Sequence, residues 1–214
     1  MLQALVQLNA GYAIMAGGVT PKKMFKALNS DLKALSILES LNERNKESIF
    51  GAIAKEIKNI NVHQLDARAF LDDELAEQGT MVHGRAKIQE HYLYQGIHVA
   101  KEIARLDIGQ SIVVNRGTIL AVEAFEGTDS MLLRAGLLES KESIFVKTVK
   151  PGQDYRFDVP VFGMQTLGVM EESGIKAVAL EARHTIIIEK EKVLAAAKAK
   201  KITMVGYNPG VITC

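Results

Sequence analysis

Apolar residues recur at helical spacing along much of the chain. Leucine returns at every third position from Leu32 to Leu41, and isoleucine at every fourth from Ile49 to Ile57. These periods predict helices that cover a sheet, and Pro21 suits the first position of an earlier helix. The same reasoning predicts further helices over 4–8, 70–75, 88–103, 128–138, 165–172 and 189–198.

Short apolar and β-branched runs predict strands over 12–16, 61–65, 111–114, 118–122, 143–149, 176–180, 184–188 and around 202. Asn115-Arg116-Gly117 separates two of these runs by a connection of hairpin length, so that pair should be antiparallel. Elsewhere strands alternate with helices, which is typical of parallel pairing. The periodicity lapses from Gln78 to Lys87, the predicted linker. We therefore expect an α/β protein with domains over 1–80 and 85–214.

The composition excludes several classes of partner and compartment. Of 214 residues, 48% are hydrophobic, and 26 basic against 25 acidic residues leave a net charge of +1. No overall field would draw nucleic acid, so a bound anion must be held by local groups. The single cysteine, Cys214, excludes an internal disulfide and fits a reducing cytoplasm. No apolar run approaches the roughly 20 residues of a membrane span, which leaves peripheral contact with a membrane as the open alternative.

The first segment with candidate chemistry runs from Ala121 to Asp129. An apolar strand there ends in carboxylates and a glycine before a helix begins, and ligands of α/β sheets bind beyond strand carboxyl ends. Glu123, Glu126 and Asp129 are candidate oxygen ligands for Mg²⁺, while the helix start at Gly127 and Thr128 is a candidate phosphate site. The alternative is structural, with Thr128 or Asp129 as a plain helix N-cap.

The second segment runs from Lys147 to Pro160 and is dense in charged groups. Lys147 and Lys150 leave a strand, and Asp154, Arg156 and Asp158 alternate with apolar residues, so they would share one face of an extended piece. Cations that neutralise phosphoryl oxygens, beside a carboxylate that holds metal or orients water, suit phosphate cleavage. The alternative is a surface ladder of ion pairs on an edge strand bounded by prolines.

Other motifs carry no assignment. Gly17-Gly18 is not followed by the Lys-Ser/Thr ending of a P-loop, and the histidines lack metal-ligand spacing. The serines lack the Gly-x-Ser-x-Gly setting of a nucleophile elbow. A nicotinamide-dependent oxidoreductase has only the α/β alternation in its favour, because the Gly-x-Gly-x-x-Gly fingerprint is missing.

Three blocks carry a resemblance to a known family: 106–111, 122–135 and 146–160. In order and spacing they resemble the LpxI-type UDP-2,3-diacylglucosamine pyrophosphatases of lipid A biosynthesis, and the likeness continues less sharply over 13–73. It implies a cytoplasmic hydrolase of lipopolysaccharide lipid metabolism that uses Mg²⁺ and cleaves UDP-2,3-diacylglucosamine to UMP and lipid X (2,3-diacylglucosamine 1-phosphate). It also implies a mixed-sheet C-terminal domain, and leaves peripheral contact with the inner membrane and homodimerisation open.

The resemblance also suggests roles for individual residues. The essential carboxylate would be Asp154, with Asp158 second. Glu126 and Asp129 would hold the metal, and the substrate would be bound by Gly127, Thr128, Lys147, Lys150, Gln153 and Arg156. The acyl chains would need an apolar cleft, for which the candidates, equally good as core, are Phe125, Met131, Phe157, Phe162 and Met164.

One departure from the family concerns the N-terminal domain. Family members begin with a further strand, a glycine-rich turn and more helix before the segment that matches Met15 to Thr20. We therefore expect an incomplete Rossmann-like domain here, with an exposed sheet edge that invites dimerisation. Either the shortened chain keeps the hydrolase activity, or it is a fragment or a non-catalytic binder of the nucleotide-sugar lipid.

Overall fold

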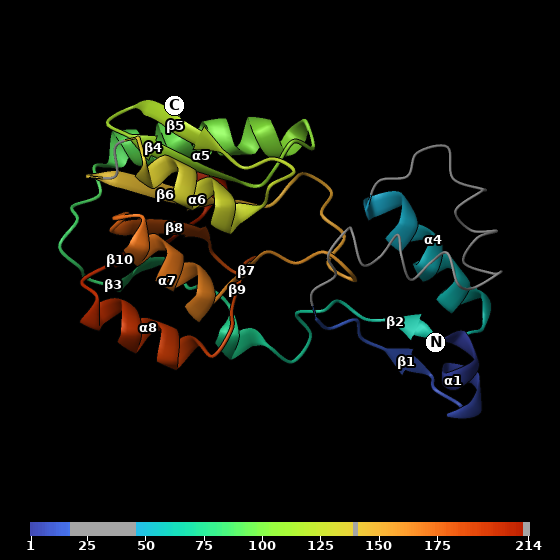
Figure 1. Ribbon diagram of the computed structural model, residues 1–214. Helices are drawn as coiled ribbons and strands as arrows, with labels where there is room; N and C mark the ends of the chain where they lie inside the picture. Colours follow the sequence, from blue (N-terminus) through green and yellow to red (C-terminus); the bar gives the residue numbers. More distant parts are fainter. Residues whose placement is uncertain (18–45, 139–140, 212–214) are drawn as a thin grey trace. The chain divides into compact units, whose positions relative to one another are not determined.

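The computed structural model describes residues 1–17, 46–138 and 141–211 (Figure 1). The chain divides into two compact units, which we call the N-terminal unit (1–69 with 154–158) and the C-terminal unit (70–153 with 159–214). The helices predicted after Pro21 and over 32–41 lie outside the described residues.

The described part of the N-terminal unit contains α1 (Leu2–Gln7), β1 (Tyr12–Ala13), α4 (Lys46–Asn59) and β2 (His63–Gln64). β1 pairs with β2 in parallel, Tyr12 opposite His63, as the alternation of strand and helix predicted. Residues 154–158 also belong to this unit, because the Ala67 amide donates to the Tyr155 carbonyl at 2.8 Å and Phe50 stacks on Phe157.

A six-stranded mixed sheet forms the centre of the C-terminal unit. Its strands lie in the order β3 (Gly79–Val82), β10 (Thr203–Tyr207), β8 (Ala177–Glu181), β6 (Ser143–Lys147), β4 (Ser111–Asn115) and β5 (Thr118–Val122). β6, β8 and β10 run parallel, whereas β4 is antiparallel to both neighbours and β3 is antiparallel to β10. The predicted mixed sheet and the antiparallel hairpin at Asn115-Arg116-Gly117 are therefore confirmed.

Helices cover both faces of this sheet (Figure 1). α5 (Glu90–Arg105) packs Leu93, Ile97 and Ala100 on one face. The other face carries α6 (Thr128–Gly136), α7 (Met164–Glu172) and α8 (Lys190–Ala199). Sheet side chains that alternate between the faces supply both cores, since neighbours on a strand point to opposite sides.

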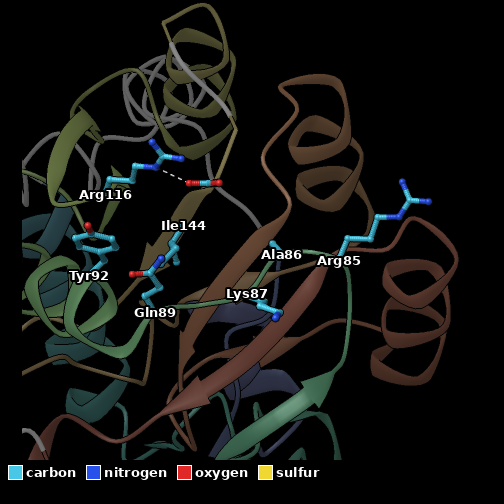
Figure 2. Close-up of a pocket in the computed structure, with 8 residues that line it drawn as sticks. Arg85, Ala86, Lys87, Gln89, Tyr92, Arg116 and Ile144 are labelled. Carbon is cyan, nitrogen blue, oxygen red and sulfur yellow. Dashed lines mark hydrogen bonds and ion pairs between the residues drawn. The ribbon is translucent and has the colours of Figure 1, made fainter.

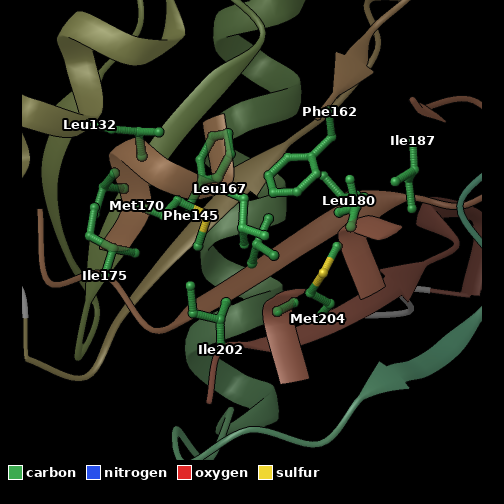
Figure 3. Packing of buried hydrophobic residues seen from close by; sticks show 14 of the residues in the cluster. Leu132, Phe145, Phe162, Leu167, Met170, Ile175, Leu180, Ile187, Ile202 and Met204 are labelled. Carbon is green, nitrogen blue, oxygen red and sulfur yellow. The ribbon is translucent and has the colours of Figure 1, made fainter. Parts of the chain in front are cut away.

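The larger core lies beneath α6, α7 and α8, and Figure 3 shows Phe145, Phe162, Leu180 and Met204 meeting there. Met131 and Phe162 are fully buried in it, so these two candidates for an acyl cleft are core residues instead. Phe125, by contrast, is 88% exposed.

The remaining elements refine the sequence predictions. β3 falls inside the predicted linker, and β7 (Val161–Phe162) pairs in parallel with β9 (Ile186–Ile187), which lies within the strand predicted over 184–188. The acidic helix expected over 70–75 is a single 3-10 turn, Asp72–Glu74, and a second such turn spans Pro209–Val211. In the described part of the chain, no helix combines the length and apolarity needed to cross a bilayer.

Candidate functional site

Most of the polar groups predicted to act in the C-terminal unit lie at one edge of its sheet. β5, β6, β8 and β10 run in the same direction, so all four end at this edge. Glu123 follows β5, Lys147 ends β6 and Glu181 ends β8. Carboxyl ends of parallel strands are where α/β sheets bind ligands, so this carboxyl edge is the candidate site of the C-terminal unit.

Lys147 is buried, with 7% of its surface exposed. Its ammonium donates to the Thr128 hydroxyl at 3.2 Å and to the Ser111 hydroxyl at 3.4 Å. Among the described residues it forms no ion pair, although burying an unpaired ammonium is costly. The strand thus holds a cation at the carboxyl edge with neutral partners. Two of its three N–H groups have partners among the described residues, so the third can donate to an anionic ligand.

Thr128 begins α6 without capping it. Its hydroxyl donates to Glu123 Oε1 at 2.8 Å, and the N-cap is Gly127, whose φ of 84° suits glycine. No side-chain cap forms at this helix, so the N-cap alternative for Thr128 and Asp129 is wrong. Thr128 instead connects a carboxylate to the buried ammonium of Lys147.

The two predicted metal ligands each have donors of their own. Arg134 donates to Glu126 Oε1 at 2.6 Å, and this hydrogen bond lowers the pKa of the Glu126 carboxyl. Asp129 accepts from Gln165 Nε2 at 2.6 Å and from the Thr166 hydroxyl at 3.1 Å, which joins the starts of α6 and α7.

Whether these residues fit a metal ion depends on free oxygens. Within 1–17, 46–138 and 141–211, no three His, Cys, Asp or Glu side chains gather closely enough to hold a metal between them. Glu123 Oε2, however, is buried and accepts no hydrogen bond from any described residue. Mg²⁺ often takes only one or two carboxylates, with water and substrate phosphates as its other ligands, so this oxygen fits the requirement.

Glu181 organises the turn that follows Lys147. Its carboxylate, 2% exposed, accepts from the Thr148 hydroxyl at 2.7 Å, the Val149 amide at 2.9 Å and the Lys101 ammonium at 2.7 Å. Sequence reasoning missed Glu181 and Lys101, because nothing in their local patterns signals a contact between residues 80 positions apart. Burial and the nearby Glu181 charge raise the pKa of Tyr207, whose hydroxyl donates to the Lys147 carbonyl at 3.1 Å.

Lys150 and Gln153 lie in the same turn. Lys150 pairs with Asp107 at 3.1 Å, and its own side chain is 12% exposed. Gln153 Oε1 accepts from the Lys150 amide and from Gln110 Nε2, both at 3.3 Å. Both predicted substrate-binding residues therefore also hold the turn in shape.

The other predicted residues belong to the N-terminal unit. Residues 154–158 form a turn in which the Asp158 amide donates to the Asp154 carbonyl at 3.1 Å, so this piece is not extended and its charged residues do not share one strand face. Arg156 donates to both oxygens of Asp154, with the closest contact at 2.5 Å. Its guanidinium is thus bound to a carboxylate of the chain itself.

A second bidentate ion pair of this kind was missed from sequence. Arg68 donates to both oxygens of Asp66 through its side chain, and its amide donates to Asp66 Oδ1 at 2.8 Å. Asp154-Tyr155-Arg156 repeats this local pattern, so the Asp-x-Arg spacing was the signal that could have revealed both. The Arg68 guanidinium also lies 3.5 Å from the centre of the Tyr155 ring.

The ion pair between Asp154 and Arg156 should make an acid-sensitive contribution to the stability of the fold. Hydrogen bonding from Arg156 lowers the pKa of Asp154 in the folded state. The Asp154–Arg156 pair therefore makes its full contribution to the free energy of unfolding above the pKa of Asp154 in the unfolded chain, about 3.9. That contribution is lost as the pH falls through the lower pKa of Asp154 in the folded state. Urea unfolding should show Asp154→Asn less stable than wild type at pH 7, with the difference shrinking below about pH 4.

Arg156→Met provides the matched control for this effect. It should remove the same contribution, and the double variant should lose no more than either single variant, because both act on one interaction. If the difference in free energy of unfolding between wild type and Asp154→Asn did not change with pH, the Asp154–Arg156 ion pair would not be what stabilises the fold.

A cavity of about 330 Å³ lies at the opposite edge of the sheet, where β6 begins. Its lining is Arg85, Ala86, Lys87, Gln89, Tyr92, Arg116, Glu142 and Ile144. Figure 2 shows Arg85 extending away from Tyr92 and Gln89, and Arg116 is paired with Glu142 at 2.5 Å. None of the residues predicted to bind substrate or metal lines it.

The fold and the carboxyl edge define a two-domain α/β protein. The profile of the LpxI N-terminal domain matches residues 1–74, and that of the LpxI C-terminal domain matches residues 77–205. A protein of Caulobacter vibrioides named UDP-2,3-diacylglucosamine pyrophosphatase LpxI is 30% identical over 208 residues, covering 91% of this chain and 73% of its own length. The chain therefore belongs to the LpxI family.

Proposed function

We propose that this protein is a Mg²⁺-dependent hydrolase of UDP-2,3-diacylglucosamine that releases UMP and 2,3-diacylglucosamine 1-phosphate. The observation that carries the proposal is Lys147, a buried ammonium at the carboxyl edge with only hydroxyl partners among the described residues. The name of the Caulobacter relative supplies the substrate.

The residues of the carboxyl edge suit an anionic diphosphate. The Lys147 ammonium would bind phosphoryl oxygens and stabilise the charge that develops when water attacks phosphorus and the bridging P–O bond breaks. The start of α6 at Thr128, behind Gly127, offers backbone amides and the positive end of a helix dipole to the same anion. A fixed site of this kind requires no reorganisation during the reaction, which is what lowers the barrier.

Magnesium is part of the proposal. When bound, a divalent cation would supply Lewis-acid neutralisation of the phosphoryl oxygens, and Glu123 Oε2, which has no donor in the described part of the chain, is the oxygen that suits it. The predicted essential carboxylate, Asp154, is held by Arg156 with its pKa lowered, so it would act in its ionised form, as a ligand or a water-orienting group.

The test is UMP release from UDP-2,3-diacylglucosamine, measured with Mg²⁺ and again with a chelator. We expect release that the chelator abolishes, and near-complete loss in Asp154→Asn. A folded sample that binds UDP but releases no UMP would support the alternative, a non-catalytic binder of the nucleotide-sugar lipid. Normal hydrolysis by Asp154→Asn would remove Asp154 from the catalytic set while leaving the activity itself established.

A further inference from the structure

The backbone around Glu123 is held tightly in place. The Glu123 amide donates to the Ser111 carbonyl at 2.8 Å, which extends the pairing of β4 with β5. Gly109 packs so closely that a Cβ added there would lie 2.0 Å from the Glu123 carbonyl oxygen. Only a residue without a side chain permits this approach, so Glu123 has a defined position at the carboxyl edge.

The two oxygens of the Glu123 carboxylate have different surroundings. Oε1 accepts from the Thr128 hydroxyl at 2.8 Å. Oε2 is buried, and no donor in the described part of the chain reaches it. Buried polar atoms are almost always bonded, and leaving a carboxylate oxygen unmatched is costly. This oxygen therefore lacks a hydrogen-bond partner among the described residues, and a bound ligand would supply one.

The surrounding groups indicate what kind of ligand this is. The buried cation of this edge, Lys147, donates to Thr128 and Ser111, and Thr128 already donates to Oε1. Glu126 and Asp129, the neighbouring acids, are bound by Arg134 and by Gln165 and Thr166. Glu123 Oε2 is thus the buried carboxylate oxygen of this turn that no donor among the described residues reaches, and a divalent cation with a phosphate as a further ligand would suit it.

We infer that Glu123, in place of Glu126 or Asp129, supplies a carboxylate ligand to the divalent cation at this edge. The choice of a divalent cation rests on the proposed function, which uses one. Thr128 is then a positioning residue, because its hydroxyl holds Oε1 and leaves Oε2 facing the ion. The exposed Glu126, bound to Arg134, stabilises the start of α6 and takes no part in binding the ion.

The experiment measures Mn²⁺ binding to the full chain by EPR of the free ion, with and without UMP. We expect Glu123→Gln to weaken Mn²⁺ binding at least about 10-fold, since even residues behind metal ligands have effects of this size. Glu126→Gln is the matched control, a carboxylate of the same turn, and should bind Mn²⁺ as wild type does. Thermal melts should show Mn²⁺ raising the Tm of wild type and of Glu126→Gln but not of Glu123→Gln.

The outcomes separate this inference from the proposed function. Wild type that binds no Mn²⁺, or Glu123→Gln that binds it normally, would overturn the inference, as would Glu123→Gln that loses UMP release while keeping its affinity for Mn²⁺. Binding of Mn²⁺ that depends on Glu123, in a chain that releases no UMP, would support the inference and count against the hydrolase. Glu123→Gln removes the negative charge and keeps a side chain of the same size, so its melting curve without metal checks that the variant is folded.

Discussion

Lys147→Met should abolish most of the activity without destabilising the protein. The change replaces a buried ammonium, which has only hydroxyl partners among the described residues, by an apolar chain of similar length. Loss of a charge that stabilises the transition state should lower kcat/KM for UMP release by about 100- to 1,000-fold. The free energy of unfolding should stay the same or rise, because replacing a poorly compensated buried charge by an apolar group removes its desolvation cost.

Lys101→Met is the matched control, since it also removes a lysine near this edge. Lys101 is the cation paired with buried Glu181, so its loss should lower the free energy of unfolding by about 1–3 kcal/mol. Lys147→Met should therefore keep its free energy of unfolding and lose UMP release, whereas Lys101→Met should lose free energy of unfolding and keep UMP release. Normal kcat/KM in Lys147→Met would show that this ammonium does not contact the reacting phosphates.

The contrast between these lysines could not be read from sequence. Lys101 and Lys147 are both lysines in strongly patterned elements, and only the fold gives Lys101 a carboxylate from β8 and Lys147 a pair of hydroxyls. Interactions of this kind join residues far apart in the chain, whereas periodicity reports only on neighbours. Sequence could nominate Lys147, but it could not show that its partners are neutral.

Local patterns predicted the fold well where the structure is itself local. The hairpin of β4 and β5 was found with nearly the observed ends, because two β-branched runs flank a short turn. β3 was missed because Gly79-Thr80 carries no apolar period and the strand exists only through its pairing with distant β10. An edge strand with one buried residue leaves little pattern to detect.

The acidic turn illustrates a second limit. Glu123, Glu126 and Asp129 are spaced three apart, and each is an equally reasonable metal ligand on sequence alone. Hydrogen bonds distinguish these acids in the structure: Glu126 accepts from Arg134, and Asp129 accepts from Gln165 and Thr166. Gln165 and Thr166 belong to a different helix, α7. Which carboxylate keeps a buried oxygen without a donor among the described residues is thus set by tertiary contacts, although the position of the turn at a strand end was predictable.

Glu181→Ala should be the most destabilising single change at the carboxyl edge. Truncation removes the acceptor for the Thr148 hydroxyl, the Val149 amide and the Lys101 ammonium, all within 2.9 Å of one oxygen. Breaking a buried charged interaction while its partners remain costs about 3–5 kcal/mol. For a chain of this size the Tm should fall by roughly 10 °C, measured by calorimetry, with a matching loss in urea unfolding.

Glu171→Ala tests whether any lost ion pair would have this effect. Glu171 pairs with Lys200 on the surface, and exposed pairs contribute little, so the Tm of this variant should match wild type. Glu181→Gln should fall between the two, because its amide keeps one acceptor oxygen but points a donor group at the remaining partners. If Glu181→Ala melted like Glu171→Ala, the turn that follows Lys147 would have to be held by its other contacts, and Glu181 would no longer account for its shape.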